Sequence, residues 1–359
     1  FHNSKEGFDQ LLILLRKLDA SQSIRIGLEA TGHYGFNLKM FLEKNGFSFM
    51  EFNPILTHKF SQAQSLRKTK TDSLDAKSIA GLLLSVEYKT YPPQSYHMFF
   101  LKSLSRLRSS LVLQRSKHIV QITNILDYLF PEFKPFFNHK FGETAVYLLE
   151  KFGSPSKISK MKTSHYNSLC SISRGHFSYA KFIQLKALAS NTIGITDPIL
   201  LLELSSILQL FKGVNSQISK LEFQIKTLIS TFNSPIFSIP GIGIISAASI
   251  LSEFGNISRF NSPAQMLSFA GMDPAIYQSG TESNKGKMVK RGSGYLRATL
   301  FQVAEYSLIW NPVFYDYYKK KRLEGKSHLV ALSHLARKLI RLIYTLETKH
   351  VNFDQTLLR

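Results

Sequence analysis

The sequence is poor in residues that cross-link or anchor a chain. Its 359 residues include a single cysteine, Cys170. One thiol can form no internal disulfide and no cysteine-based zinc site. No uninterrupted apolar run reaches the roughly 18 residues that a membrane-spanning helix needs, and the N-terminal residues show no signal-peptide pattern. These absences predict a reduced, intracellular protein.

Acidic residues are also scarce. There are 24 Asp and Glu against 45 Lys and Arg, which leaves a formal net charge of +21. The excess is spread along the chain rather than held in one tail, so we expect an extended polyanion as partner. Nucleic acid fits this description best, and a membrane surface is the competing polyanion.

The N-terminal residues alternate between helix and strand patterns. Residues 24–28 and 47–52 read as strands, each preceded by an amphipathic helix. This order favours an α/β layer with a partly parallel sheet. Glu29 follows the first strand directly, at the carboxyl end, where ligands gather in such sheets.

Two aspartates, Asp72 and Asp75, open the next helix on one face. Acids in a first turn can simply offset the helix dipole and cap free N–H groups. If they converge with Glu29, three carboxylates repel one another unless a divalent cation neutralises them, and oxygen ligands suit Mg2+ or Mn2+. Lys68 and Lys70 lie just before this helix and are candidates for nucleic-acid contact.

Two long helices are predicted in the middle of the chain, over residues 95–130 and 197–232. In the first, Arg108, Arg115 and His118 interrupt the apolar stripe; they could face a partner helix, nucleic acid or solvent. The second would be about 50 Å long and carries a coiled-coil seam. The seam could pair with the first helix or with another subunit, and we interpret it as a spacer and oligomerisation arm. Its apolar positions are Leu204, Ile207, Phe211, Val214, Ile218, Leu221, Ile225 and Leu228.

Residues 239–243, with the sequence IPGIG, resemble a helix-hairpin-helix motif. Glycines such as Gly241 and Gly243 let backbone N–H groups approach a DNA phosphate at a helix N-terminus. A plain turn that joins two helices is the alternative.

Residues 277–297 are polar and basic and lead into a helix expected from Tyr295. A hydroxyl on a flexible loop among cations suits attack on, or binding to, a phosphate-bearing polymer. A basic surface loop is the alternative. Ser279 is the candidate nucleophile, with Ser283 and Ser293 as chemical rivals. The candidate phosphate contacts are Lys285, Lys287, Lys290, Arg291 and Arg297.

These pieces together resemble a family of insertion-sequence transposases, the bridge-RNA-guided recombinases. The resemblance rests on EATG at 29–32, KTDSLDA at 70–76, IPGIG at 239–243, FAGMDP at 269–274, QSG at 278–280, KRG at 290–292 and LR at 296–297. It implies an α/β RuvC-like (ribonuclease H-like) domain at 1–94, a coiled-coil region at 95–232 and a mainly α-helical, serine-bearing transposase domain at 233–359.

The resemblance also implies roles. Glu29, Asp72 and Asp75 would be three of four acids of a Mg2+ (or Mn2+) site, with the fourth, an aspartate, expected upstream of Phe1. Ser279 would form a covalent phosphoserine link to DNA. Donor and target DNA and a guide RNA would be the partners of a tetramer built from dimers, in which the acids of one protomer meet the serine of another. Such a protein would be prokaryotic, cytoplasmic and nucleoid-associated, without a membrane partner.

Two other functions fit the same residues. A RuvC-like metal-dependent nuclease would hydrolyse DNA with water, and Ser279 would only bind DNA. A non-enzymatic coiled-coil scaffold would bind nucleic acid, and the acids would only cap a helix.

Overall fold

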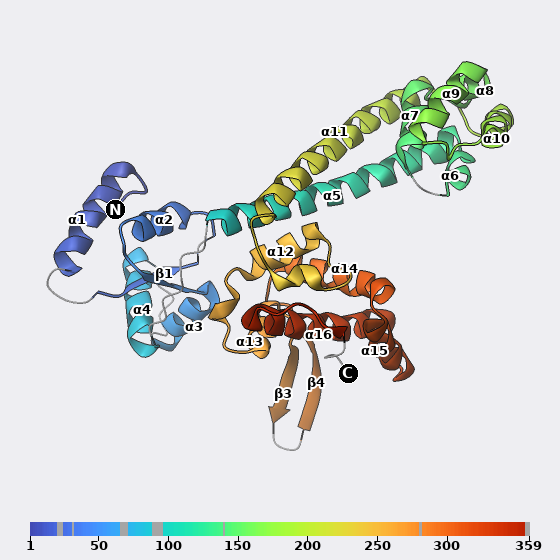
Figure 1. The fold of residues 1–359 in the computed structure, drawn as a ribbon. Coiled ribbons are helices and arrows are strands. Elements are labelled where there is room, and N and C mark those ends of the chain that lie inside the picture. The colour runs from blue at the N-terminus through green and yellow to red at the C-terminus, as the bar shows by residue number, and fades with distance from the viewer. Residues whose placement is uncertain are drawn as a thin grey trace. The chain divides into compact units, whose positions relative to one another are not determined.

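The chain forms two compact units, Phe1–Ser95 and Tyr96–Arg359, in a computed structural model. The structure describes residues 1–19, 24–30, 32–64, 71–87, 96–138, 141–279 and 282–355; the side chains of residues 96–97 and 276–287 lie outside this description. The described residues are mostly helical (Figure 1).

The N-terminal unit contains a parallel pair of strands. Glu29 pairs with Phe52 at the carboxyl ends of the two strands. The predicted order of helices and strands is confirmed. Helix α2 provides the crossover between β1 and β2 that parallel strands require. The described part of this unit has two strands, so a larger RuvC-like sheet stays an expectation. Its elements are α1 (Lys5–Asp19), β1 (Ile26–Glu29), α2 (Phe36–Lys44), β2 (Phe49–Phe52), α3 (Pro54–Gln64) and α4 (Asp72–Ser85).

Helix α4 packs directly on the backbone of β1 at Gly27. A side-chain carbon at Gly27 would lie 2.6 Å from Leu83 Cδ1 and 2.9 Å from Ile79 Cγ2, closer than packed atoms approach. Glycine therefore allows the helix that begins with Asp72 to rest against the strand that ends with Glu29.

Two long helices, α5 (Tyr96–Leu129) and α11 (Pro198–Ile229), lie side by side in the C-terminal unit (Figure 1). Helix α11 starts at Asp197, whose carboxylate accepts hydrogen bonds from the N–H groups of Ile199 and Leu200. Of the two partners that the sequence allowed for the seam, the structure shows the hairpin within the chain. The seam residues at seven-residue spacing are buried: Leu204, Phe211, Ile218 and Ile225.

The apolar content of α11 corrects one sequence-based expectation. By length and composition, α11 could cross a membrane, although its apolar residues are not contiguous in the sequence. Long helices of protein cores have the same property. One face of α11 packs on α5, and Arg108 on α5 forms an ion pair with Glu222 on α11, with 2.7 Å between Arg108 Nη2 and Glu222 Oε1. These contacts cover one face of α11, whereas 17% of its most apolar stretch of 18 residues is buried.

Short helices cap the far end of the hairpin and form a core of their own, around Leu129, Leu148, Phe182 and Leu204. They occupy the stretch of the chain between α5 and α11. They are α6 (Phe133–Phe136), α7 (Glu143–Lys151), α8 (Pro155–Ser159), α9 (Thr163–Ile172) and α10 (Tyr179–Ser190).

The other core of this unit surrounds α16, where Leu335, Leu339 and Ile343 are fully buried. Helix α12 lies in the same core and is buried along its second half. The contributing elements are η1 (Pro235–Ser238), α12 (Ile244–Phe254), η2 (Ile257–Arg259), α13 (Pro263–Phe269), α14 (Gly294–Trp310), α15 (Pro312–Leu323) and α16 (His328–Lys349).

A β-hairpin extends from this helical core (Figure 1). Strands β3 (Pro274–Ser279) and β4 (Glu282–Met288) pair in antiparallel fashion, with an irregularity between Pro274 and Ile276. The sequence predicts a flexible polar loop over this stretch, and that prediction is wrong for the backbone. The polar residues give no apolar alternation, and the strand pairing satisfies their backbone groups instead.

Candidate functional site

Glu29 is held at the carboxyl end of β1. Its Oε2 accepts a hydrogen bond of 2.8 Å from the hydroxyl of Thr57, a buried residue of α3. The Ala30 N–H donates to the carbonyl of Phe52 and continues the strand pairing past Glu29. The carboxylate is thus fixed at the sheet edge where the sequence places it.

Asp72 and Asp75 occupy the first turn of α4, as predicted. The Thr71 hydroxyl caps this helix by accepting a hydrogen bond of 3.3 Å from the Leu74 N–H. Asp72 is exposed and Asp75 is half-buried. Because the Thr71 hydroxyl already caps the helix, neither aspartate is required as its N-cap.

The expected metal ligands have the right chemistry but are not gathered. Three carboxylates suit a hard divalent cation. Within the described ranges, however, no three residues of the types His, Cys, Asp and Glu form a group that could hold a metal ion. Glu29, Asp72 and Asp75 therefore do not make a complete site by themselves. Lys68 and Lys70 lie outside the described residues.

Ser279 is the last residue of β3, next to the turn of the hairpin. Its backbone pairs with Glu282, the first residue of β4. Lys285, opposite Ile276, and Lys287 also belong to β4. The backbone thus brings the candidate nucleophile and two candidate phosphate contacts onto one hairpin.

Close contacts between glycines fix the base of this hairpin. Gly271 has a φ of +64°, and a side-chain carbon there would lie 2.5 Å from the Gly292 nitrogen. A side-chain carbon at Gly292 would lie 2.1 Å from the Phe269 carbonyl oxygen. Larger residues at either position would separate the strands where they leave the core.

The candidate phosphate contacts near the base differ in their surroundings. Arg297 Nη1 donates to the carbonyl oxygens of Gly292, at 2.6 Å, and Ala270, at 3.2 Å. Arg297 therefore braces the base of the hairpin, a role that the sequence did not predict. Lys290 and Arg291 are exposed, so they are better placed than Arg297 to reach a phosphate.

The two glycines of the helix-hairpin-helix-like stretch have different surroundings. Gly241 has a φ of +92°, and a side-chain carbon there would lie 2.7 Å from Ser307 Oγ on α14. Gly243 is exposed, has open space around it and precedes α12 without a side-chain cap. Gly241 thus serves packing, and Gly243 leaves the first N–H groups of α12 available to an anion.

A buried carboxylate near the hairpin has no signal in the sequence. Glu253 on α12 accepts hydrogen bonds from Arg106 Nε, at 2.5 Å, and Arg106 Nη2, at 2.9 Å, and Lys102 Nζ lies 3.6 Å away. Burial alone would raise the pKa of Glu253, but Arg106 and Lys102 hold it below its usual value. Ser293 caps α14 by accepting a hydrogen bond from the Leu296 N–H. Ser293 is therefore engaged structurally, which weakens it as a rival nucleophile.

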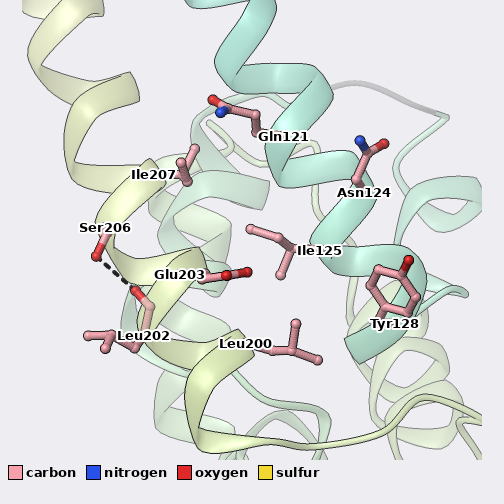
Figure 2. Close-up of a pocket in the computed structure, with 9 residues that line it drawn as sticks. All are labelled: Gln121, Asn124, Ile125, Tyr128, Leu200, Leu202, Glu203, Ser206 and Ile207. Carbon is pink, nitrogen blue, oxygen red and sulfur yellow. Dashed lines mark hydrogen bonds between the residues drawn. The ribbon is translucent and has the colours of Figure 1, made fainter.

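A separate hollow of about 570 Å3 lies between α5 and α11 (Figure 2). Among the described residues that line it, Glu203 carries the one charge. A hollow with an acid and no cation offers little to a phosphate. Its lining residues are Gln121, Asn124, Ile125, Tyr128, Leu200, Leu202, Glu203, Ser206 and Ile207.

Comparison with known families accounts for both ends of the chain. Residues 1–131 match the family model DEDD_Tnp_IS110, a transposase, and residues 233–319 match the model of the transposase IS116/IS110/IS902 family. The chain belongs to the IS110/IS116/IS902 family of transposases. The first match contains Glu29, Asp72 and Asp75, and the second contains Ser279. Transposases cleave and transfer DNA, and a DEDD-type transposase domain is typically metal-dependent.

Individual relatives agree with this family. An insertion element IS110 protein of Streptomyces coelicolor is 25% identical over 286 residues, which are 78% of this chain and 71% of that protein. An insertion element IS116 protein of Streptomyces clavuligerus is 22% identical over 349 residues, 94% of this chain and 86% of that protein. A pilin gene-inverting protein of Moraxella bovis is 29% identical over 149 residues, 39% of this chain and 46% of that protein.

Proposed function

We propose that this transposase cuts and rejoins DNA through a covalent bond between Ser279 and a DNA phosphate. The observation that carries this proposal is the position of Ser279 at the turn end of β3, on a hairpin whose base is fixed and carries the exposed Lys290 and Arg291. The similarity to a protein named for gene inversion supports rejoining, since an inverted segment has to be joined again at both ends.

The chemistry exchanges one ester bond for another. The Ser279 oxygen bonds to phosphorus, one P–O bond of the DNA backbone breaks, and the leaving deoxyribose oxygen takes up a proton as the serine loses one. Phosphoryl transfer of this kind depends on positioning and on stabilising charge. Lys285 and Lys287 on β4 are the candidate cations on the same hairpin, and Lys290 and Arg291 at its base can hold the flanking DNA backbone. The energy of the phosphodiester is kept in the protein–DNA bond, so rejoining needs no ATP.

We further infer that Glu29, Asp72 and Asp75 contribute to a Mg2+ or Mn2+ site that other residues complete. The acids and Ser279 belong to different compact units, and assembly of several copies, as a tetramer, is one way to bring them together. The net charge of +21 suits both DNA and a guide RNA as partners of a cytosolic, nucleoid-associated protein.

Serine substitution tests the covalent step. We expect the wild-type chain, incubated with its RNA and a cleavable DNA, to leave a protein–DNA adduct that survives denaturation. Ser279→Ala should leave none. Ser283→Ala, which removes a hydroxyl from the facing strand, should still form it. An adduct with Ser279→Ala would show that another residue is the nucleophile.

Aspartate substitution tests the metal site. Asp72→Asn and Asp75→Asn should reduce DNA cleavage by at least about 100-fold and weaken Mn2+ binding measured by electron spin resonance, because each removes a charged oxygen donor. Asp9→Asn, on α1 of the same unit, is the matched control and should change neither. Undiminished cleavage by both variants would assign these acids to helix stability alone.

A RuvC-like nuclease is the second candidate, favoured by the DEDD_Tnp_IS110 match to residues 1–131. It would leave free 5′-phosphate ends and no adduct.

The guide RNA is tested separately, by sequencing the RNA that co-purifies with the full chain. One discrete noncoding RNA is expected, and a mixture of cellular RNAs would contradict a guide.

A further inference from the structure

A groove of about 690 Å3 lies within the C-terminal unit, between α5, α12 and α14. It is separate from the β-hairpin and from the hollow in Figure 2. Most of its lining residues are polar, and no Asp or Glu is among the described residues that line it. The groove lining therefore carries no acid of its own, and it combines polar side chains with a larger apolar surface.

Positive charge comes to the groove from two sources. Arg108 and Arg115 line it. The ion pair with Glu222 largely neutralises Arg108, whereas Arg115 has no ion pair in the described part of the chain. The first turn of α12 contributes Ile245 and Ser246 to the lining. That turn follows Gly243 without a side-chain cap, so its N–H groups and the positive end of the helix dipole are open to a phosphate.

Ser105 is a buried polar residue in the wall of the groove. It lines the groove on α5 and is 4% exposed. Its hydroxyl has no hydrogen-bond partner among the described residues. Buried hydroxyls are nearly always bonded, so Ser105 adds an unpaired polar group behind the wall of the groove, although its oxygen is itself shielded from solvent.

Two exposed tyrosines flank the groove on α14. Tyr295 is 40% exposed and Tyr306 is 47% exposed. They are eleven residues apart, which is three helical turns, so they lie on one face about 16 Å apart along the axis. The Arg106 guanidinium covers one face of the Tyr295 ring at 5.2 Å. Exposed rings of this kind are platforms on which unpaired bases stack.

We propose that this groove binds an unpaired nucleic-acid strand, with a phosphate at Arg115 and the α12 N-terminus and bases on Tyr295 and Tyr306. The proposal rests on the proposed function only in requiring that the transposase handle nucleic acid. A duplex fits less well, because its bases already stack on one another and expose no faces to the tyrosines. A protein segment as occupant would not need the cations.

Strand binding by the full chain tests the groove. The probes are fluorescent 20-mers of thymidine and of uridine, with a 20-base-pair duplex for comparison. Tyr306→Leu and Arg115→Gln should each weaken binding of a 20-mer strand about tenfold, since one stacked base or one phosphate contact is lost. Binding of the duplex should stay within twofold. Tighter binding of uridine would assign RNA, and tighter binding of thymidine would assign DNA.

Matched variants control for general charge and folding. Lys117→Gln removes the same charge from the same helix, outside the groove lining, and Tyr128→Leu removes an exposed ring elsewhere on α5. Both should bind the strand as the wild type does. Ultraviolet crosslinking of the wild-type chain adds a readout that needs no variant, and the crosslinked peptides should contain Tyr295 or Tyr306.

Crosslinks confined to other regions, or equal losses in the groove variants and their controls, would overturn the proposal. A protein partner would be the occupant to test next. The two proposals fail independently. Ser279→Ala should bind the strand normally. If the wild-type chain forms no covalent adduct but still crosslinks through α14, the phosphoserine proposal is contradicted and the groove proposal stands.

Discussion

Glu253 is a buried carboxylate whose two cationic partners both come from α5. The contact joins residues 147 positions apart in the sequence. The carboxylate's partner Arg106 also lies over the ring of Tyr295 on α14, 5.2 Å from the ring centroid, just after the base of the hairpin. One carboxylate and its arginine partner therefore link three helices that meet beside the proposed nucleophile strand.

Replacing Glu253 by Gln should destabilise the chain by about 3 kcal/mol, because Arg106 and Lys102 lose a charged partner. Glu222→Gln, at a more exposed ion pair, should cost less than about 1 kcal/mol. Urea unfolding measures both. The folded-state pKa of Glu253 lies below that of an ordinary glutamate, because Arg106 and Lys102 outweigh the effect of burial. The difference between wild type and Glu253→Gln should therefore be full above the unfolded-state pKa of about 4.3 and shrink as the pH falls below it. A difference that stayed constant down to pH 3 would contradict the pairing.

At the scale of elements, the hairpin of α5 and α11 depends on a seam of buried side chains. Ile225→Ala removes a fully buried residue and should cost about 3 kcal/mol. Phe223→Ala, on the same helix but 66% exposed, should change stability by less than about 0.5 kcal/mol. Thermal unfolding distinguishes the two. Equal costs would mean that Phe223 is also covered, for example by another copy of the chain.

Elements with a regular apolar period could be predicted, and contacts between distant residues could not. The heptads predicted α11, and the strand pattern placed Glu29 at a sheet end. The seam alone could not choose its partner, because a heptad fits any matching face. Strands β3 and β4 carry polar residues on both faces, so the period-two signal of a half-buried strand is missing.

The candidate site was predictable to a similar extent. The expectation that Glu29, Asp72 and Asp75 converge needs tertiary structure, because no local pattern fixes the distance between β1 and the start of α4. The brace at Arg297 was interpreted as a phosphate contact, since a guanidinium looks the same in sequence whether it binds a phosphate or two carbonyls. Ser105 is an ordinary helix residue in sequence, and only its surroundings distinguish it.

For the whole molecule, the division into two compact units predicts independent folding. The C-terminal unit contains both of the larger cores, around α16 and around the helices that cap the hairpin of α5 and α11. A chain of residues 96–359 should therefore fold alone, with a cooperative thermal transition. Its circular dichroism should show the helix content that these residues have in the full chain. A broad, noncooperative transition would show that the N-terminal unit is needed for folding.

Because the base of the β-hairpin is fixed, the number of residues between that base and Ser279 determines the face of the hairpin on which Ser279 lies. Successive strand residues point to opposite faces, and at the root the backbones around Gly271 and Gly292 pack directly on each other. Inserting one residue in β3 would turn the serine to the other face, and inserting two would restore its face about 7 Å farther out. The length of this strand, counted as odd or even, thus decides which side of the hairpin can present the hydroxyl to DNA.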